Sequence, residues 1–114
     1  MKVTHRTPII EPDGWRFRAS SGIVVTLQRR RKLRLVLAAL VHCRLERPGH
    51  VLSPSQLIEA GWPDERIYPR AARARLHVAV SSLRKLGLGD ALEFHQGGYR
   101  LDPAVDVAPL SDAA

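Results

Sequence analysis

The chain has 114 residues, 45% of them hydrophobic and 25% charged, which fits one folded domain with a modest core and excludes a largely disordered chain. Lys and Arg number 18 against 11 Asp and Glu, and the net charge of +7 indicates a polyanionic partner: nucleic acid, an anionic membrane or an acidic protein. The single cysteine, Cys43, excludes an intramolecular disulfide and a cysteine-based zinc site. The longest apolar stretch, residues 35–41, is too short to span a membrane, and residues 1–15 lack the pattern of a signal peptide. We therefore expect a cytoplasmic protein with no membrane partner.

The positive charge is concentrated in two blocks. Residues 28–50 carry seven basic residues and one acidic residue, and residues 70–86 carry five basic residues and no acidic one. Residues 51–69 and 87–114 are net acidic. Each basic block has the periodicity of a helix, so the charge is predicted to lie on two helices.

Two short strands are expected before the first helix. Residues 1–13 form an arm or an edge strand in this interpretation. The alternation in residues 14–18 places Trp15 and Phe17 on one face, and residues 23–27 are rich in β-branched side chains, so the two segments predict a β-hairpin.

The first helix is predicted over about residues 29–46. Its apolar side chains recur at helical spacing, and they form one stripe: Leu33, Val36, Leu37, Leu40 and Val41. The helix should end before Pro48.

A second, short helix begins after Ser53. Ser53 is a good N-cap, Pro54 fits the first helical position and Gln56 completes a capping box. Gly61 and Pro63 should end this helix, and a loop follows at residues 61–69.

The third helix is predicted to run from Pro69 or Arg70 to about Leu86. Gly87 is the candidate C-cap. The side chains expected on its core face are Leu76, Val80 and Leu83.

A second hairpin is predicted at residues 92–102, with its turn at Gly97 and Gly98. Residues 104–114 have no periodic pattern and are expected to form a disordered tail. This order of elements predicts an α+β fold of the winged helix-turn-helix type over residues 14–103. It has an N-terminal hairpin or short sheet, three helices, and a C-terminal hairpin as the wing.

The motifs "PGHVLS", "QLIEAGWP", "LHVAVSSLRKLG" and "GGYRLDP" occur in this order. In their order and spacing, the chain resembles the OmpR/PhoB-type winged-helix effector domain of bacterial transcriptional regulators. The resemblance covers about residues 14–103. It implies a sequence-specific regulator of transcription that binds double-stranded DNA, here without a receiver domain. It also implies a nucleoid-associated location, a contact between residues 61–69 and RNA polymerase, and a homodimer on DNA.

The third helix is the expected recognition element in the major groove. His77, Ser81 or Ser82 can hydrogen-bond to base edges, and Val78 can contact a thymine methyl group. The resemblance places Val78 and Ser82 at base-contacting positions and Arg84 at a phosphate-contacting position. The full predicted set on this helix is Arg70, Arg73, Arg75, His77, Val78, Ser81, Ser82, Arg84 and Lys85.

Further DNA contacts are expected from the wing and from two helix starts. The resemblance places His95 where family members have a minor-groove arginine. Gln96 and Arg100 are the other wing candidates. The candidates for the DNA backbone at the helix starts are Arg30, Arg31, Lys32 and Ser55.

Two interpretations compete with DNA binding. In the first interpretation, the basic helix faces are simply solvated surfaces. In the second, the protein is a protein-interaction adaptor that binds an acidic partner. An enzyme is not expected, because the five histidines lack ligand spacing and no nucleophile or phosphate-loop motif occurs. No metal or cofactor is predicted.

Overall fold

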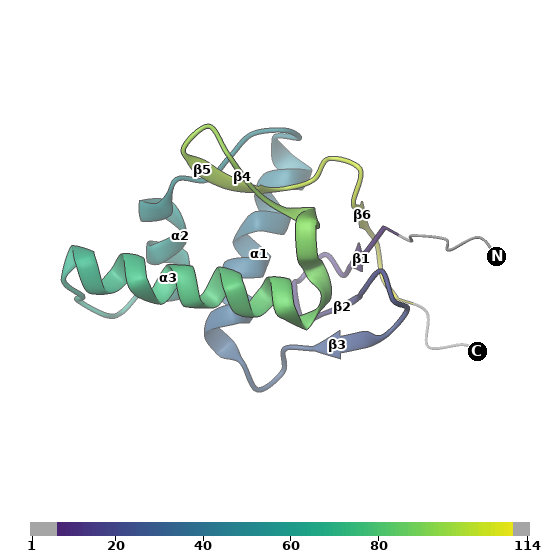
Figure 1. The fold of residues 1–114 in the computed structure, drawn as a ribbon, viewed down its shortest axis with the longest axis horizontal. Coiled ribbons are helices and arrows are strands. Elements are labelled where there is room, and N and C mark those ends of the chain that lie inside the picture. Colours follow the sequence, from purple (N-terminus) through teal and green to yellow (C-terminus); the bar gives the residue numbers. More distant parts are fainter. Residues whose placement is uncertain (1–6, 111–114) are drawn as a thin grey trace.

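The computed structural model describes residues 7–110, which form an α+β fold of three α-helices and two small sheets (Figure 1). The predictions for residues 1–6 and 111–114 lie outside this range. The elements in chain order are β1 (Ile9–Ile10), β2 (Arg16–Arg18), β3 (Val24–Thr26), α1 (Arg31–Glu46), α2 (Pro54–Gly61), α3 (Pro69–Leu83), β4 (Leu92–His95), β5 (Gly98–Leu101) and β6 (Asp106–Val107).

The first sheet has the strand order β3-β2-β1-β6. The β2–β3 pair is antiparallel and confirms the predicted hairpin. The prediction that Trp15 and Phe17 share a face is wrong: Phe17 is fully buried, whereas Trp15 is 40% exposed and lies against Arg34. The reason is that β2 begins only at Arg16, so Trp15 belongs to the preceding turn, where strand alternation does not apply.

Two predictions about the ends of the chain are wrong within the described residues. Strand β1 lies between β2 and β6, so it is an interior strand and not an edge strand. Part of the expected tail forms β6, which pairs in parallel with β1, and Val105 and Leu110 are buried. Arg44 of α1 holds this segment by donating hydrogen bonds to the carbonyls of Pro103 (2.6 Å) and Val105 (3.0 Å).

The core lies between the first sheet and the three helices. All five residues of the predicted stripe on α1 are buried, and so are Leu76, Val80 and Leu83 of α3. The capping box of α2 is also confirmed: Ser53 Oγ accepts from the Gln56 N–H (3.1 Å), and Gln56 Oε1 accepts from the Ser53 N–H (2.8 Å). None of the helices in the described part of the chain has the length and apolar character needed to cross a membrane.

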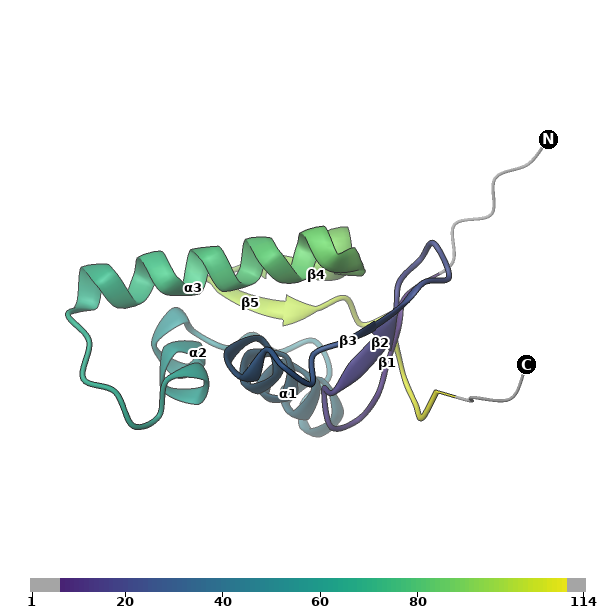
Figure 2. The ribbon, with the colours of Figure 1, turned by 90° about the horizontal axis from the view of Figure 1, so that it is seen from below.

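The β4–β5 hairpin is confirmed, but its turn is displaced by one residue from the prediction. Gln96 (φ 50°) and Gly97 (φ 79°) form the two-residue turn, and Gly98 is the first residue of β5. Gly98 is buried because the chain before α2 crosses it: a Cβ there would lie 2.6 Å from the Leu52 carbonyl oxygen. Leu52 and Tyr99 exchange backbone hydrogen bonds of 2.8 and 2.9 Å, which tie the hairpin to the segment before α2 (Figures 1 and 2).

The end of α3 is fixed against the first sheet. After Leu83 the chain continues through a wider helical turn (Arg84–Leu88) and a short 3-10 turn (Gly89–Ala91). Gly87 adopts φ 142° inside the wider turn, and a Cβ there would lie 2.5 Å from the Cβ of Ala19. This close approach sets the position at which α3 ends.

We predict that Gly87→Ala destabilises the protein more than Gly89→Ala. Both glycines have positive φ in sparsely populated backbone regions, so each substitution should cost about 1–3 kcal/mol in backbone strain. Gly89 has open space around it, whereas the new methyl group at position 87 collides with Ala19 and should cost a further 1–3 kcal/mol, as an approximate range for overpacking. Urea unfolding of both variants measures the difference, and equal losses would contradict the packing described here.

Candidate nucleic-acid interface

One side of α3 is open to solvent and carries no acidic side chain. The residues opposite its buried face recur at helical spacing and continue into the wider turn after Leu83. We call them the α3 ridge: Arg70, Ala74, His77, Val78, Ser81 and Lys85. Val78 is 66% exposed although it is apolar. Figure 2 shows α3 as the outermost layer on its side of the molecule, with α1 and α2 below it.

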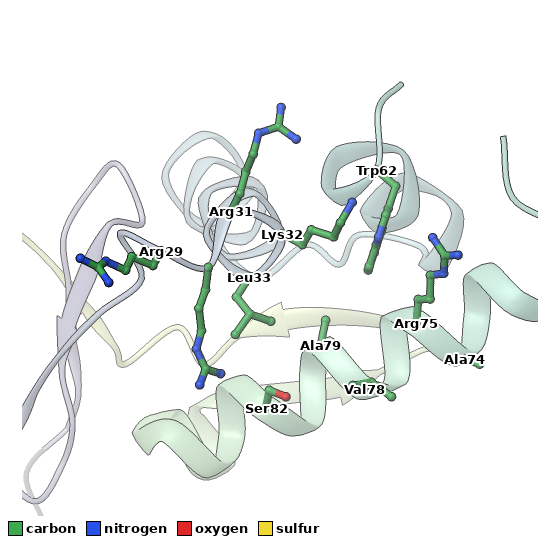
Figure 3. Close-up of a pocket in the computed structure, with 11 residues that line it drawn as sticks. Arg29, Arg31, Lys32, Leu33, Trp62, Ala74, Arg75, Val78, Ala79 and Ser82 are labelled. Carbon is green, nitrogen blue, oxygen red and sulfur yellow. The ribbon is translucent and has the colours of Figure 1, made fainter. Parts of the chain in front are cut away.

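A groove of about 810 Å³ runs between the start of α1 and one flank of α3 (Figure 3). Residues 29–32 form one wall, and Ala74, Val78 and Ser82 of α3 form the other. Leu33 and Trp62 are among the buried side chains that line it. The groove thus combines a cationic wall with an apolar floor.

The basic residues at the start of α1 do not all face α3. Arg31 points away from α3, and Arg29 points toward the N-terminal sheet, whereas Lys32 points toward Trp62 (Figure 3). The first turn of α1 has no acidic residue and its N-cap, Arg30, makes no capping hydrogen bond. Cations at a helix N-terminus are unfavourable for the helix dipole, so this arrangement favours an external anion.

Glu65 connects the two basic helices across the groove. Its Oε2 pairs with Nζ of Lys32, and its Oε1 accepts from Nη1 of Arg75 at 3.1 Å. The hydrogen bond from Lys32 is the largest cause that lowers the pKa of the Glu65 carboxyl, and Arg75 adds to it. Glu65 is not among the residues predicted from the sequence, because its two partners lie in other elements of the fold.

On the other flank of α3, a hollow of about 220 Å³ separates α3 from the β4–β5 hairpin. Arg73 and His77 of α3, together with Phe94 and Gly97 of the hairpin, line it. Phe94 is 61% exposed, and its ring packs edge to face against the ring of Tyr99, with 5.1 Å between the two ring centroids. Phe94 was also missed. Leu92 and Phe94 occupy alternate positions of β4, and alternation would bury both side chains, but only Leu92 is buried.

Besides Arg75, which pairs with Glu65, two more of the predicted DNA-contacting arginines are engaged within the protein. Arg84 donates from Nε and Nη2 to the Leu92 carbonyl (3.0 and 2.8 Å). Arg100 donates to Glu93 (2.8 Å) and to the Gly49 carbonyl (3.0 Å). The structure thus places both side chains where they hold the hairpin in position.

The remaining candidates lie at the hairpin turn and at the start of α2. Gln96 is exposed at the turn, and His95 is partly buried in β4, where it pairs with Gly98. Ser55 is exposed beside the capping box of α2. Across residues 7–110, no three His, Cys, Asp or Glu side chains come together in a way that could hold a metal ion.

Comparisons of the chain with family models, with curated proteins and with solved structures give no match. The OmpR/PhoB-type resemblance therefore stays an interpretation of the sequence motifs. The evidence for a function comes from the geometry and charge of the α3 ridge and its two flanks.

We predict that Arg84→Ala lowers the stability of the protein, whereas Lys85→Ala does not. Arg84 makes two charge-assisted hydrogen bonds to Leu92, and their loss should cost about 1.5–3 kcal/mol. Lys85 is the exposed neighbour with the same charge sign, and its replacement should change stability by less than about 0.5 kcal/mol. Urea unfolding separates the two, and equal stabilities would show that the Arg84 contacts do not anchor the hairpin.

A second prediction concerns the Glu65 carboxyl. Its pKa, followed by NMR of the side-chain carbon, should lie below that of an unperturbed glutamate and should rise more in Lys32→Ala than in Arg75→Ala. The sign follows from the lowered pKa: the contribution of Glu65 to stability is present at neutral pH and is lost as the pH falls through the folded-state pKa. An unchanged pKa in Lys32→Ala would contradict the bridge.

Proposed function

We propose that the chain is a winged helix-turn-helix protein that binds double-stranded DNA in a sequence-specific manner and regulates transcription. In this proposal α2 and α3 form the helix-turn-helix, and the β4–β5 hairpin is the wing. The observation that carries the proposal is the acid-free α3 ridge, exposed between a cationic groove on one flank and the hairpin on the other.

The α3 ridge has the chemistry that a major-groove helix needs. Ala74 and Ser81 are small, so they allow the helix backbone to approach the bases. His77 and Ser81 can hydrogen-bond to base edges, and Val78 offers an apolar contact for a thymine methyl group. Ser82 adds a hydroxyl group at the protein groove between α1 and α3.

Arginines on both flanks are suited to the phosphates that border the major groove. Arg73 lines the hollow on the hairpin side, and Arg75 lines the groove on the α1 side. Arg70 lies at the start of α3, and Arg30 lies at the start of α1. Such contacts fix the register of a protein on DNA, while base contacts provide the specificity.

The hairpin would reach the neighbouring minor groove through its turn, where Gln96 is exposed. Arg84 and Arg100 then serve DNA binding indirectly, because they hold the hairpin beside α3. RNA polymerase is the proposed partner of the loop between α2 and α3, where Tyr68 is 86% exposed. A homodimer on repeated half-sites completes the proposal.

A protein-interaction adaptor is the second candidate, and the apolar floor of the groove favours it. Leu33 and Trp62 line the groove beneath the basic side chains, which suits an acidic segment with apolar residues. Salt discriminates between the two candidates. Binding to DNA through several phosphates weakens steeply with salt and leaves a residual affinity that depends on sequence.

Selection from a random pool of duplex DNA at near-physiological salt, followed by sequencing, tests the proposed function. Enrichment of a defined motif is the expected result, and its repeat spacing would report the dimer geometry. Salt-sensitive binding without any enriched motif would contradict a sequence-specific regulator.

We predict that Val78→Glu abolishes binding to the selected motif and leaves the fold intact. Val78 is exposed on the α3 ridge, so a carboxylate there meets the DNA without disturbing the core. The matched control is Leu45→Glu, because Leu45 is 52% exposed near the opposite end of α1 from the groove. Fluorescence anisotropy should show a loss of at least about tenfold for Val78→Glu and little change for Leu45→Glu. The same affinity in both variants would exclude the ridge from the interface.

A further inference from the structure

Two cations that line the groove come from different helices and converge on one carboxylate. Lys32 belongs to the first turn of α1 and Arg75 to α3, and each contacts a different oxygen of Glu65. These two residues come from the two basic blocks of the sequence, yet the acidic partner comes from the loop between α2 and α3. The three side chains form a single bridge between elements that would otherwise repel each other electrostatically.

We propose that Lys32 and Arg75 form a seat for one anionic group, which Glu65 fills in the free protein and a backbone phosphate fills when DNA is bound. The inference rests on the proposed function, because it takes DNA as the partner. It assigns to Glu65 the role of a built-in competitor for the phosphate.

The chemistry of the seat suits a phosphate as well as it suits a carboxylate. Lys32 and Arg75 provide two charged donors for two separate oxygens, and a phosphodiester presents two unesterified oxygens of the same kind. The ammonium group of Lys32 also lies 5.5 Å from the centre of the Trp62 ring, which orients it by a cation–π contact. Trp62 is buried, so this orientation does not depend on the occupant of the seat.

Glu65 is an occupant that can be displaced. The side chains of Lys32, Glu65 and Arg75 are 44%, 42% and 48% exposed, and ion pairs in such exposed positions contribute little to stability. Glu65 lies on a loop and not in a helix, so its side chain can leave the seat without unfolding an element. A phosphate that belongs to a long polyanion has the additional advantage of releasing condensed counterions.

The seat also lies where a DNA backbone is expected. Val78 and Ser82 line the same groove as Lys32 and Arg75, and Val78 belongs to the α3 ridge (Figure 3). When this ridge enters the major groove, one backbone borders the flank of α3 that faces α1. Glu65 therefore lowers the affinity for duplex DNA of any sequence, since every such duplex must displace it.

The test compares Glu65→Gln with Glu59→Gln on a duplex of arbitrary sequence. Each substitution removes one negative charge, but Glu59 is exposed on α2 and is not the carboxylate that pairs with Lys32 and Arg75. Binding is measured by fluorescence anisotropy at about 0.1 M salt, where exposed charges are screened beyond about 10 Å. Circular dichroism and thermal unfolding confirm that both variants are folded.

We expect Glu65→Gln to bind on the order of threefold tighter than the unmodified protein, and Glu59→Gln less than about 1.5-fold tighter. In a protein that already carries Arg75→Gln, adding Glu65→Gln should give no gain over Arg75→Gln alone, because the seat then lacks one of its cations. Equal gains for Glu65→Gln and Glu59→Gln, or a gain that survives Arg75→Gln, would overturn the inference.

This outcome is separate from that of the proposed function. If a motif is enriched but Glu65→Gln and Glu59→Gln show equal gains in affinity, the proposed regulator is supported and the proposed phosphate seat is rejected. A gain confined to Glu65→Gln without any enriched motif would support the seat and contradict sequence-specific regulation.

Discussion

The burial of one face of α3 is the constraint on which the rest of the structure depends. Leu76, Val80 and Leu83 lie in the core, and α3 packs against α1 and α2, so the opposite face of the helix is held outward. Burial of apolar side chains of this size contributes about 1.5–3 kcal/mol each, which is enough to fix the rotation of the helix about its axis. The packing of the core therefore determines which side chains form the exposed α3 ridge.

A second constraint fixes what lies on either side of this helix. The apolar stripe of α1 places the basic start of that helix along one flank of α3, and the hydrogen bonds from Arg84 to Leu92 hold the β4–β5 hairpin along the other. The positive charge at the start of α1 is unfavourable for the helix dipole, and the described residues provide one acidic side chain, Glu65, that bridges this block to α3. The start of α1 thus departs from the rules of helix stability, and a departure of this kind is expected at a functional surface.

Much of the fold follows from local sequence patterns. The α1 stripe, the capping box of Ser53 and Gln56 and the core face of α3 are predictable because each depends on residues within two or three helical turns. The errors concern contacts between distant segments. Strand β6 has only two residues and no periodicity, and it forms because it pairs with β1, nearly a hundred residues earlier in the sequence. The sequence predicts Gly98 in the turn because glycine is typical of turns. The structure requires a glycine at this position for another reason, the close approach of the Leu52 carbonyl oxygen, which no local pattern reveals.

The candidate site divides in the same way. The exposed positions of α3 could be predicted from spacing, but the partners of individual charges could not. Arg84 and Arg100 are both predicted DNA contacts, yet each donates hydrogen bonds to a backbone carbonyl and holds the hairpin in position. Glu65 and Phe94 gain their importance from neighbours that lie in other elements, and no local pattern marks them.

The most direct test of the central claim is an NMR titration of the isotope-labelled protein with a short duplex. If α3 and its flanks form the interface, the largest amide shifts should fall on the α3 ridge, on residues 29–32 and on the hairpin turn at Gln96. Shifts confined to the sheet of β1, β2, β3 and β6, with the α3 ridge unchanged, would contradict the account and place the polyanion on another face.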